Sequence, residues 1–276
     1  MLKTKLAEYV DARDLVVNLT LRELRSRYKK SFLGWTWSLL NPLSTVVIFS
    51  VVFAFFLKVK PPTGDPSGLK NFAAFLLCGL LPWNFLSNGM NASMGALIGN
   101  ANLIKKVYFP REVFVVSAVA SLLVSFLIEL AVLAVILLFL GNMVLPWIPV
   151  VLAIVVIQTF FVLGIGFLLS VLNVYFRDVQ HLISIALMAL FYSAPIVYPI
   201  SYVPDHAELL GMTIPLGTLY RLNPIVQLVQ VYRDAMYNLR FPPLLSVLYL
   251  LGWTLALLAI GLAVFQKLDR RLAEEV

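Results

Sequence analysis

The stretch from Val113 to Leu140 reads VFVVSAVASLLVSFLIELAVLAVILLFL and contains one charged residue, Glu129. An α-helix needs about 20 consecutive apolar residues to cross the hydrocarbon core of a bilayer. Soluble domains carry roughly 25% charged residues. This chain of 276 residues has 13% charged and 61% hydrophobic residues. The sequence therefore predicts an all-α integral membrane protein.

Apolar runs of similar length recur along the chain and indicate about six transmembrane helices. The expected spans are Trp37–Leu57, Asn71–Ile98, Val113–Leu140, Pro149–Leu172, His181–Ile200 and Leu244–Gln266. An even number of spans places both termini on the same side of the membrane.

Lysines and arginines gather in the first 30 residues, near Lys105 and Arg177, and from Lys267 onward. The positive-inside rule then places both termini in the cytoplasm. We expect one transmembrane domain, residues 1–276. Residues 1–34 lie at the cytoplasmic interface, residues 35–266 form the six-helix membrane region, and residues 267–276 are a cytoplasmic tail.

The segment from Asp14 to Lys30 has the pattern of an amphipathic helix. Apolar residues recur at helical spacing beside a basic stripe. The apolar positions are Val17, Leu21, Leu24 and Tyr28, and the basic ones are Arg22, Arg25 and Lys29. We expect this helix to lie in the cytoplasmic interface and to end before Gly34.

A short helix is predicted between the second and third spans. Asn100 or Asn102 can cap it, and Pro110 ends it. Ile104, Val107 and Tyr108 share one side, and exposed apolar residues there would suit docking of another protein. The alternative is a helix that lies on the lipid headgroups.

The segment from Ser201 to Pro243 is too long for a hairpin and too apolar for a free loop. Asn223 and Pro224 predict a capped helix start. A helix from there to Tyr237 measures about 20 Å, which is too short to span a bilayer. We expect short re-entrant helices in the outer leaflet, beside protein or a water-filled cavity.

Glu129 is the one acid deep in a predicted span. Burial of a carboxylate at that depth costs about 3 kcal/mol, so a polar partner is expected. Gln158 lies equally far from the turn near Met143, which predicts a structural hydrogen bond between Glu129 and Gln158. The alternative is a proton-coupling site at Glu129.

Aromatic residues gather on the outer side of the fifth span: Phe191, Tyr192, Tyr198 and Tyr202. They could stack on the apolar faces of sugar rings, or form an aromatic belt in the lipid interface. The chain has no phosphate-binding loop of the Gly-x-x-x-x-Gly-Lys-Ser/Thr type. It has no catalytic constellation, and with one cysteine and two histidines it predicts no metal site and no cofactor.

Five motifs in order resemble the permease subunits of ABC exporters for O-antigen, capsular polysaccharide and teichoic acid. They are LRSRYKKSFLGWTWSLLNP (24–42), NLIKKVYFPRE (102–112), NVYFRD (173–178), APIVYP (194–199) and NP (223–224). The resemblance implies a homodimer in the bacterial cytoplasmic (inner) membrane. ATP and magnesium would bind a separate cytoplasmic ATPase. The cargo would be a polyprenyl-pyrophosphate-linked glycan, and no nucleic-acid partner is expected.

The resemblance also implies roles for particular residues. Asn102, Ile104, Lys105, Val107, Tyr108 and Phe109 would form the coupling helix that docks on the ATPase. Arg22, Arg25, Arg27 and Lys29 would attract the lipid pyrophosphate, although anionic lipid headgroups are an equal alternative. Asn223, Pro224 and Arg233 would belong to the helices that gate the outer end.

Three rival functions fit parts of the sequence. An exporter of teichoic acid, or of smaller lipids or drugs, would share the fold. A membrane-embedded transferase would need an acid or histidine constellation, which the sequence lacks. A passive channel would need no coupling helix.

Overall fold

The computed structural model describes residues 13–28, 34, 36–56, 58, 62–105, 110–209 and 212–275. In this part of the chain, four helices are long and apolar enough to cross a membrane. They are α4 (Phe72–Ala96), α6 (Glu112–Phe139), α7 (Ile148–Tyr175), which follows the 3-10 turn η3 (Leu145–Trp147), and α11 (Leu244–Glu275). They confirm the second, third, fourth and sixth predicted spans as apolar helices.

Two shorter apolar helices stand where the first and fifth spans are predicted. α3 (Thr36–Phe49) continues into a π-helical segment, η1 (Ser50–Phe56), and α8 covers Val179–Ser193. The crossing of the membrane by α3 and α8, and thus the total of six spans, stays a prediction.

Helix α4 is the centre of the bundle and contacts α3, α6, α7, α8 and α10. Its start is set by Asn71, whose side-chain oxygen accepts a hydrogen bond from the Ala74 amide at 2.9 Å. Such a cap satisfies one of the amides that a helix leaves unpaired in its first turn. The Phe85 ring of α4 stacks on Phe126 of α6 with 4.7 Å between centroids.

Helices α7 and α11 approach each other at backbone distance. A β-carbon added to Gly164 would lie 2.6 Å from the Leu258 amide nitrogen, and Gly261 of α11 faces Gly164 in turn. Small residues allow this approach, which brings many backbone atoms into van der Waals contact. The glycine pair therefore sets where α11 crosses α7.

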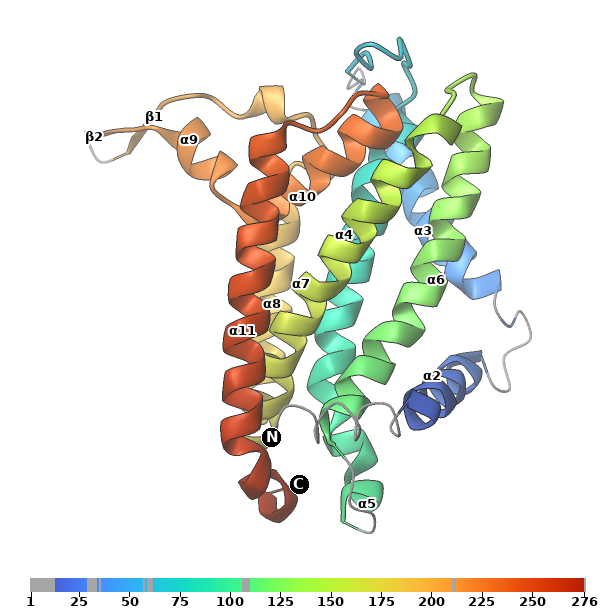
Figure 1. Cartoon of the computed structure of the whole chain (residues 1–276). Helices are drawn as coiled ribbons and strands as arrows, with labels where there is room; N and C mark the ends of the chain where they lie inside the picture. Colours follow the sequence, from blue (N-terminus) through green and yellow to red (C-terminus); the bar gives the residue numbers. More distant parts are fainter. Residues whose placement is uncertain are drawn as a thin grey trace.

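Helix α2 (Arg13–Tyr28) confirms the predicted N-terminal helix and lies across α6 (Figure 1). Leu19 and Leu24 are its buried residues, and Leu19 packs in a cluster with Leu97 and Val113. The opposite side of α2 is exposed. Of the predicted apolar stripe, Leu24 is buried, whereas Val17 and Leu21 are 49% and 43% exposed. The position of α2 in the membrane interface stays a prediction.

Short elements connect the long helices. At one end of the bundle, η2 (Ile98–Asn100) and α5 (Ala101–Ile104) follow α4. At the other end, η4 (Ile200–Tyr202), α9 (Leu216–Arg221), α10 (Pro224–Arg233) and the π-helical η5 (Asp234–Asn238) join α8 to α11. The sequence did not predict the antiparallel β1 (Ala207–Leu209) and β2 (Met212–Ile214), which pair Ala207 with Ile214.

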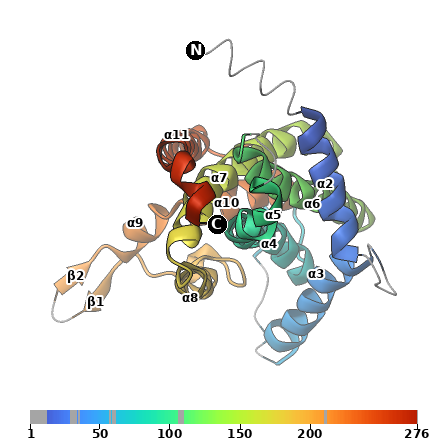
Figure 2. The same cartoon turned by 90° about the horizontal axis from the view of Figure 1, so that it is seen from below.

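The two ends of the bundle carry different elements. Helices α2 and α5 lie at the same end as the last turn of α11, whereas α9, α10 and the β-hairpin lie at the other (Figure 1). Seen from below, α3 and α8 border α4 on the outside of the bundle (Figure 2). We call the two ends the α2 end and the α10 end.

Candidate functional site

An aromatic face lies between α3 and α8, and we define it as Phe49, Phe53, Phe191 and Tyr192. The Phe49 ring lies 5.8 Å from Phe53 and 6.3 Å from Phe191, and Phe191 lies 5.2 Å from Tyr192, all between centroids. Trp83 of α4 backs this face at 5.8 Å from Phe191. The rings thus form a continuous aromatic row at the edge of the core, in which Phe49, Phe53 and Phe191 are half-buried and Tyr192 is exposed.

Two of the four aromatic residues that the sequence predicts as a glycan surface lie on this face, and two do not. Phe191 and Tyr192 do, and Tyr192 is 64% exposed. Tyr198 instead donates to the Tyr192 carbonyl at 2.9 Å and contacts the Tyr220 hydroxyl at 3.1 Å. Tyr202 is exposed in η4, beyond the end of α8.

Through these two hydrogen bonds, Tyr198 links the end of α8 to α9. Burial, together with the hydrogen bond to Tyr198, raises the pKa of the Tyr220 hydroxyl. The Tyr220 hydroxyl therefore stays protonated at physiological pH, and each of the two hydroxyls can act as donor or acceptor in this hydrogen bond. The sequence did not predict Phe49 and Phe53 for the aromatic face, although a spacing of four residues is typical of neighbours on one side of a helix. Phe49 ends α3 and Phe53 lies in η1.

The predicted start of the gate helix is confirmed. The Asn223 side chain accepts from the Ile225 amide at 2.9 Å, and Pro224 is the first residue of α10. Asn and Pro favour these two positions because the cap supplies an acceptor and proline has no amide to satisfy.

Arg233 closes α10 and is 2% exposed. Its Nε donates to the Phe75 carbonyl at 3.4 Å and its Nη2 to the Ile196 carbonyl at 2.6 Å. Its Nη1 donates to the Pro195 carbonyl. The guanidinium carbon also lies 3.6 Å from the centroid of the Phe75 ring, which is a cation–π geometry. One side chain thus joins α10 to α4 and to the APIVYP segment.

The basic side of α2 is only partly free to meet an anion. Arg22 donates to Asn100 at 2.5 Å and pairs with Glu23 at 3.0 Å, so it bridges α2 to the segment after α4. Arg25 is exposed. The side chain of Arg27 and the whole of Lys29 lie outside the described residues.

The predicted coupling helix is described only in its first half. Asn102 and Lys105 are exposed, while Ile104 is 7% exposed and packs in the cluster of Leu19, Leu97 and Val113. The expectation that Ile104 is exposed for docking is therefore wrong, because Ile104 belongs to the buried core at this end of the bundle. Val107, Tyr108 and Phe109 lie outside the described residues.

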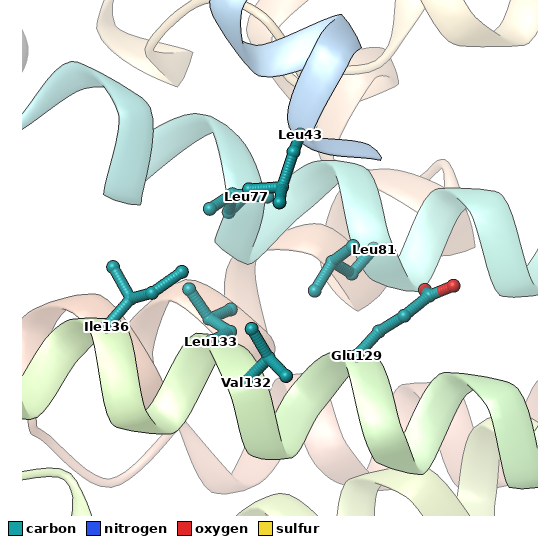
Figure 3. Close-up of a pocket in the computed structure, with 7 residues that line it drawn as sticks. All are labelled: Leu43, Leu77, Leu81, Glu129, Val132, Leu133 and Ile136. Atoms are coloured by element: carbon teal, nitrogen blue, oxygen red, sulfur yellow. The ribbon is translucent and has the colours of Figure 1, made fainter. Parts of the chain in front are cut away.

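The predicted hydrogen bond between Glu129 and Gln158 is also wrong. Gln158 donates through Nε2 to the Pro82 carbonyl at 2.7 Å and accepts from the Tyr232 hydroxyl at 2.7 Å. Glu129 points away from it, into a small pocket of aliphatic side chains between α3, α4 and α6 (Figure 3). Its neighbours there include Leu43, Leu81 and Leu133.

Comparison with known proteins places these features in a family. Residues 14–237 match the ABC-2 type transporter family. The chain belongs to that family. The ABC-2 match includes α2, the aromatic face and α10, whereas α11 begins after its last residue.

Three named transport proteins are similar to this ABC-2 family member along nearly its whole length. It is 32% identical to the O-antigen export system permease protein RfbA of Klebsiella pneumoniae over 264 residues, 95% of this chain and 94% of that protein. It is 30% identical to RfbA of Myxococcus xanthus over 98% of each chain. It is 28% identical to the polysialic acid transport protein KpsM of Escherichia coli, over 90% of this chain and 91% of that protein.

Proposed function

We propose that this chain is the membrane subunit of an ATP-driven exporter that moves polyprenyl-pyrophosphate-linked polysaccharide across the bacterial cytoplasmic membrane. The observation that carries the proposal is the extent of the similarity to RfbA proteins, which covers 98% of the chain in one case. Members of the ABC-2 family are transporter permeases, so ATP and magnesium would bind a separate subunit. Both termini, and thus the α2 end, would face the cytoplasm.

The proposed working unit is a homodimer. Helix α3, its continuation η1, and α8 expose large apolar side chains, namely Val47, Ile48, Phe55, Phe56, Leu182, Ile185 and Met188. Both helices border the same side of α4, and their rings meet at Phe49 and Phe191. A second copy placed against this side would enclose the aromatic face between the two chains.

An enclosed aromatic face suits a glycan. Aromatic rings carry a negative face, which attracts the weakly positive C–H groups on the apolar sides of a sugar ring. The contact is weak at each ring and does not depend on which sugar passes. A polymer of repeating units can therefore slide along Phe49, Phe53, Phe191 and Tyr192 without being held at one place.

The α2 end would receive both cargo and energy. Arg25, with Arg27 and Lys29, would attract the pyrophosphate, because a guanidinium matches phosphate geometry with two parallel N–H donors. The coupling segment from Asn102 to Phe109 would dock on the ATPase. Because Ile104 is buried, the contact with the ATPase would be made by Asn102, Lys105 and the residues after them.

The experiment that tests this proposal is deletion of the gene followed by complementation. We expect loss of surface polysaccharide and cytoplasmic accumulation of lipid-linked glycan, with both restored by the wild-type gene. Tyr192→Ala should reduce export. Phe139→Ala is the matched control, because Phe139 is also an exposed aromatic at the end of an apolar helix but lies on α6, off the aromatic face. Normal surface polymer in the deletion strain would overturn the proposal.

A further inference from the structure

Arg233 is a buried cation without an acidic partner. All three of its hydrogen bonds go to backbone carbonyls, which carry only partial charges. Within the part of the chain that the structure describes, no carboxylate forms an ion pair with it. Asp234, the next residue, instead forms an ion pair with Arg240 at 2.8 Å and accepts a hydrogen bond from Asn238 at 2.8 Å. A buried charge without a counter-charge is unfavourable unless something else neutralises it.

The surroundings of Arg233 are built around its side chain. A β-carbon at Gly79 would lie 2.9 Å from Nη2, so the glycine leaves room for the guanidinium. A guanidinium has five N–H donors, and the three carbonyls use three of them. Two N–H groups therefore have no acceptor among the described residues.

A cavity of about 250 Å³ opens beside Arg233 at the α10 end. It is lined by α10 and η5, by the loop before α4 and by the segment after α8. Its polar side chains, besides Arg233, are Thr63, Asp65, Ser201, Gln230, Tyr237, Asn238 and Arg240. Those of Thr63, Ser201 and Gln230 have no hydrogen-bond partner among the described residues, so the cavity offers neutral donors next to the buried cation.

Of the charged side chains that line the cavity, Arg233 is the one whose charge no nearby opposite charge balances. Arg240 is neutralised by Asp234, and its side chain is 48% exposed. Asp65 carries the opposing charge but is exposed, where water and salt screen it. The innermost part of the cavity is thus positive, polar and large enough for a small oxyanion with water.

We propose that this cavity is a binding site for an anionic group, a phosphate or a carboxylate, with Arg233 as the charge partner and Gln230 and Ser201 as hydrogen-bond donors. Arginine suits this role because its planar N–H groups can bind two oxygens of one anion. Such an anion could come from a charged substituent on a sugar or from the phosphate of a lipid headgroup. The site does not depend on the proposed export function, because the binding can be measured on the purified chain.

The test measures thermal unfolding of the full chain in detergent, with tryptophan fluorescence as the signal. Sodium phosphate, glycerol 3-phosphate and sodium glucuronate are each titrated at constant ionic strength against sodium chloride. A ligand that binds only the folded state raises Tm with concentration in a saturable way. We expect at least one of these anions to do so. Arg233→Gln should weaken the apparent affinity at least tenfold, and Arg221→Gln, on the exposed α9, should leave it unchanged.

The pattern of responses identifies the source of the anion. A response to glucuronate alone supports a charged sugar, and a response to glycerol 3-phosphate and phosphate supports a lipid headgroup. If Arg233→Gln does not fold, Gln230→Leu combined with Ser201→Ala replaces it, with a several-fold loss of affinity expected. The proposal is overturned if no anion raises Tm above the chloride control, if neutral glucose acts as well as glucuronate, or if these cavity variants respond like the wild type.

Discussion

Replacement of Gln158 by leucine removes a buried side chain that joins three helices. Gln158 of α7 is 0% exposed, and its amide binds the Pro82 carbonyl of α4 and the Tyr232 hydroxyl of α10. Leucine keeps most of the volume but can make neither hydrogen bond. Tyr232, itself 0% exposed, would keep a hydroxyl without an acceptor.

The loss of stability has two sources, the missing interhelical hydrogen bonds and the buried Tyr232 hydroxyl that is left without an acceptor. Interhelical hydrogen bonds in membrane proteins contribute about 0.6 kcal/mol on average and up to about 1.7 kcal/mol. A buried hydroxyl without a partner costs about 1–3 kcal/mol. We therefore expect Gln158→Leu to lower the free energy of unfolding by about 2–4 kcal/mol. Tyr232→Phe in the same background removes the stranded hydroxyl, so the double variant should be no less stable than Gln158→Leu.

The assay is a double-mutant cycle measured by equilibrium unfolding of the purified protein in mixed micelles. We expect a coupling free energy of about 1–2 kcal/mol between Gln158 and Tyr232. Thr159→Val is the control, since among the described residues the Thr159 hydroxyl bonds to the Val155 carbonyl of its own helix alone. Additive effects of the two substitutions, within about 0.3 kcal/mol, would refute the assigned hydrogen bond.

Three further substitutions test other parts of the fold. Gly164→Ala places a methyl group against the Leu258 backbone, so we expect a loss of about 1–3 kcal/mol in the same unfolding assay; an unchanged stability would contradict the close approach of α7 and α11. Asn223→Ala removes the hydrogen bond to the Ile225 amide and should cost about 1 kcal/mol, with Asn223→Ser retaining most of it. Glu129→Gln should leave export of surface polymer unchanged, because Glu129 lies in an aliphatic pocket with no relay of acids among the described residues; loss of export in a well-expressed variant would instead support proton coupling.

Local features of this structure could be predicted from the sequence. The cap at Asn223 and the long apolar helices depend on a few neighbouring residues or on total hydrophobicity. The helix at α2 could be predicted from the spacing of its apolar residues, but of the predicted apolar stripe Leu24 is buried whereas Val17 and Leu21 are exposed. These features need no knowledge of which helices are neighbours.

Helix rotation could not be predicted in the same way. Lipid is as apolar as a helix interface, so a spanning helix has no polar side to show which face is inside. Gln158 and Glu129 share a predicted depth, yet Gln158 faces α4 and α10 while Glu129 faces α3. Distance from a turn fixes depth but not direction.

The burial of Arg233 and Ile104 depends on contacts between distant segments. Arg233 meets Phe75 of α4, and Ile104 packs in the cluster that includes Leu19 and Val113, and no local pattern encodes either arrangement. In a short helix, an apolar residue looks the same whether a partner protein or another part of the chain covers it. The sequence therefore placed both residues in the right element and missed their surroundings.

The uneven burial of α11 has a consequence for how this protein can evolve. Between residues 244 and 268, its buried positions are Leu250, Thr254, Gly261 and Phe265, which follow one line along the helix, and most other positions in that range are exposed. Selection on that outer surface requires little more than solubility in hydrocarbon, so its residues can drift among Leu, Ile, Val and Phe. Divergent descendants should thus keep a narrow invariant line in α11, centred on Gly261, within a helix whose remaining sequence changes freely.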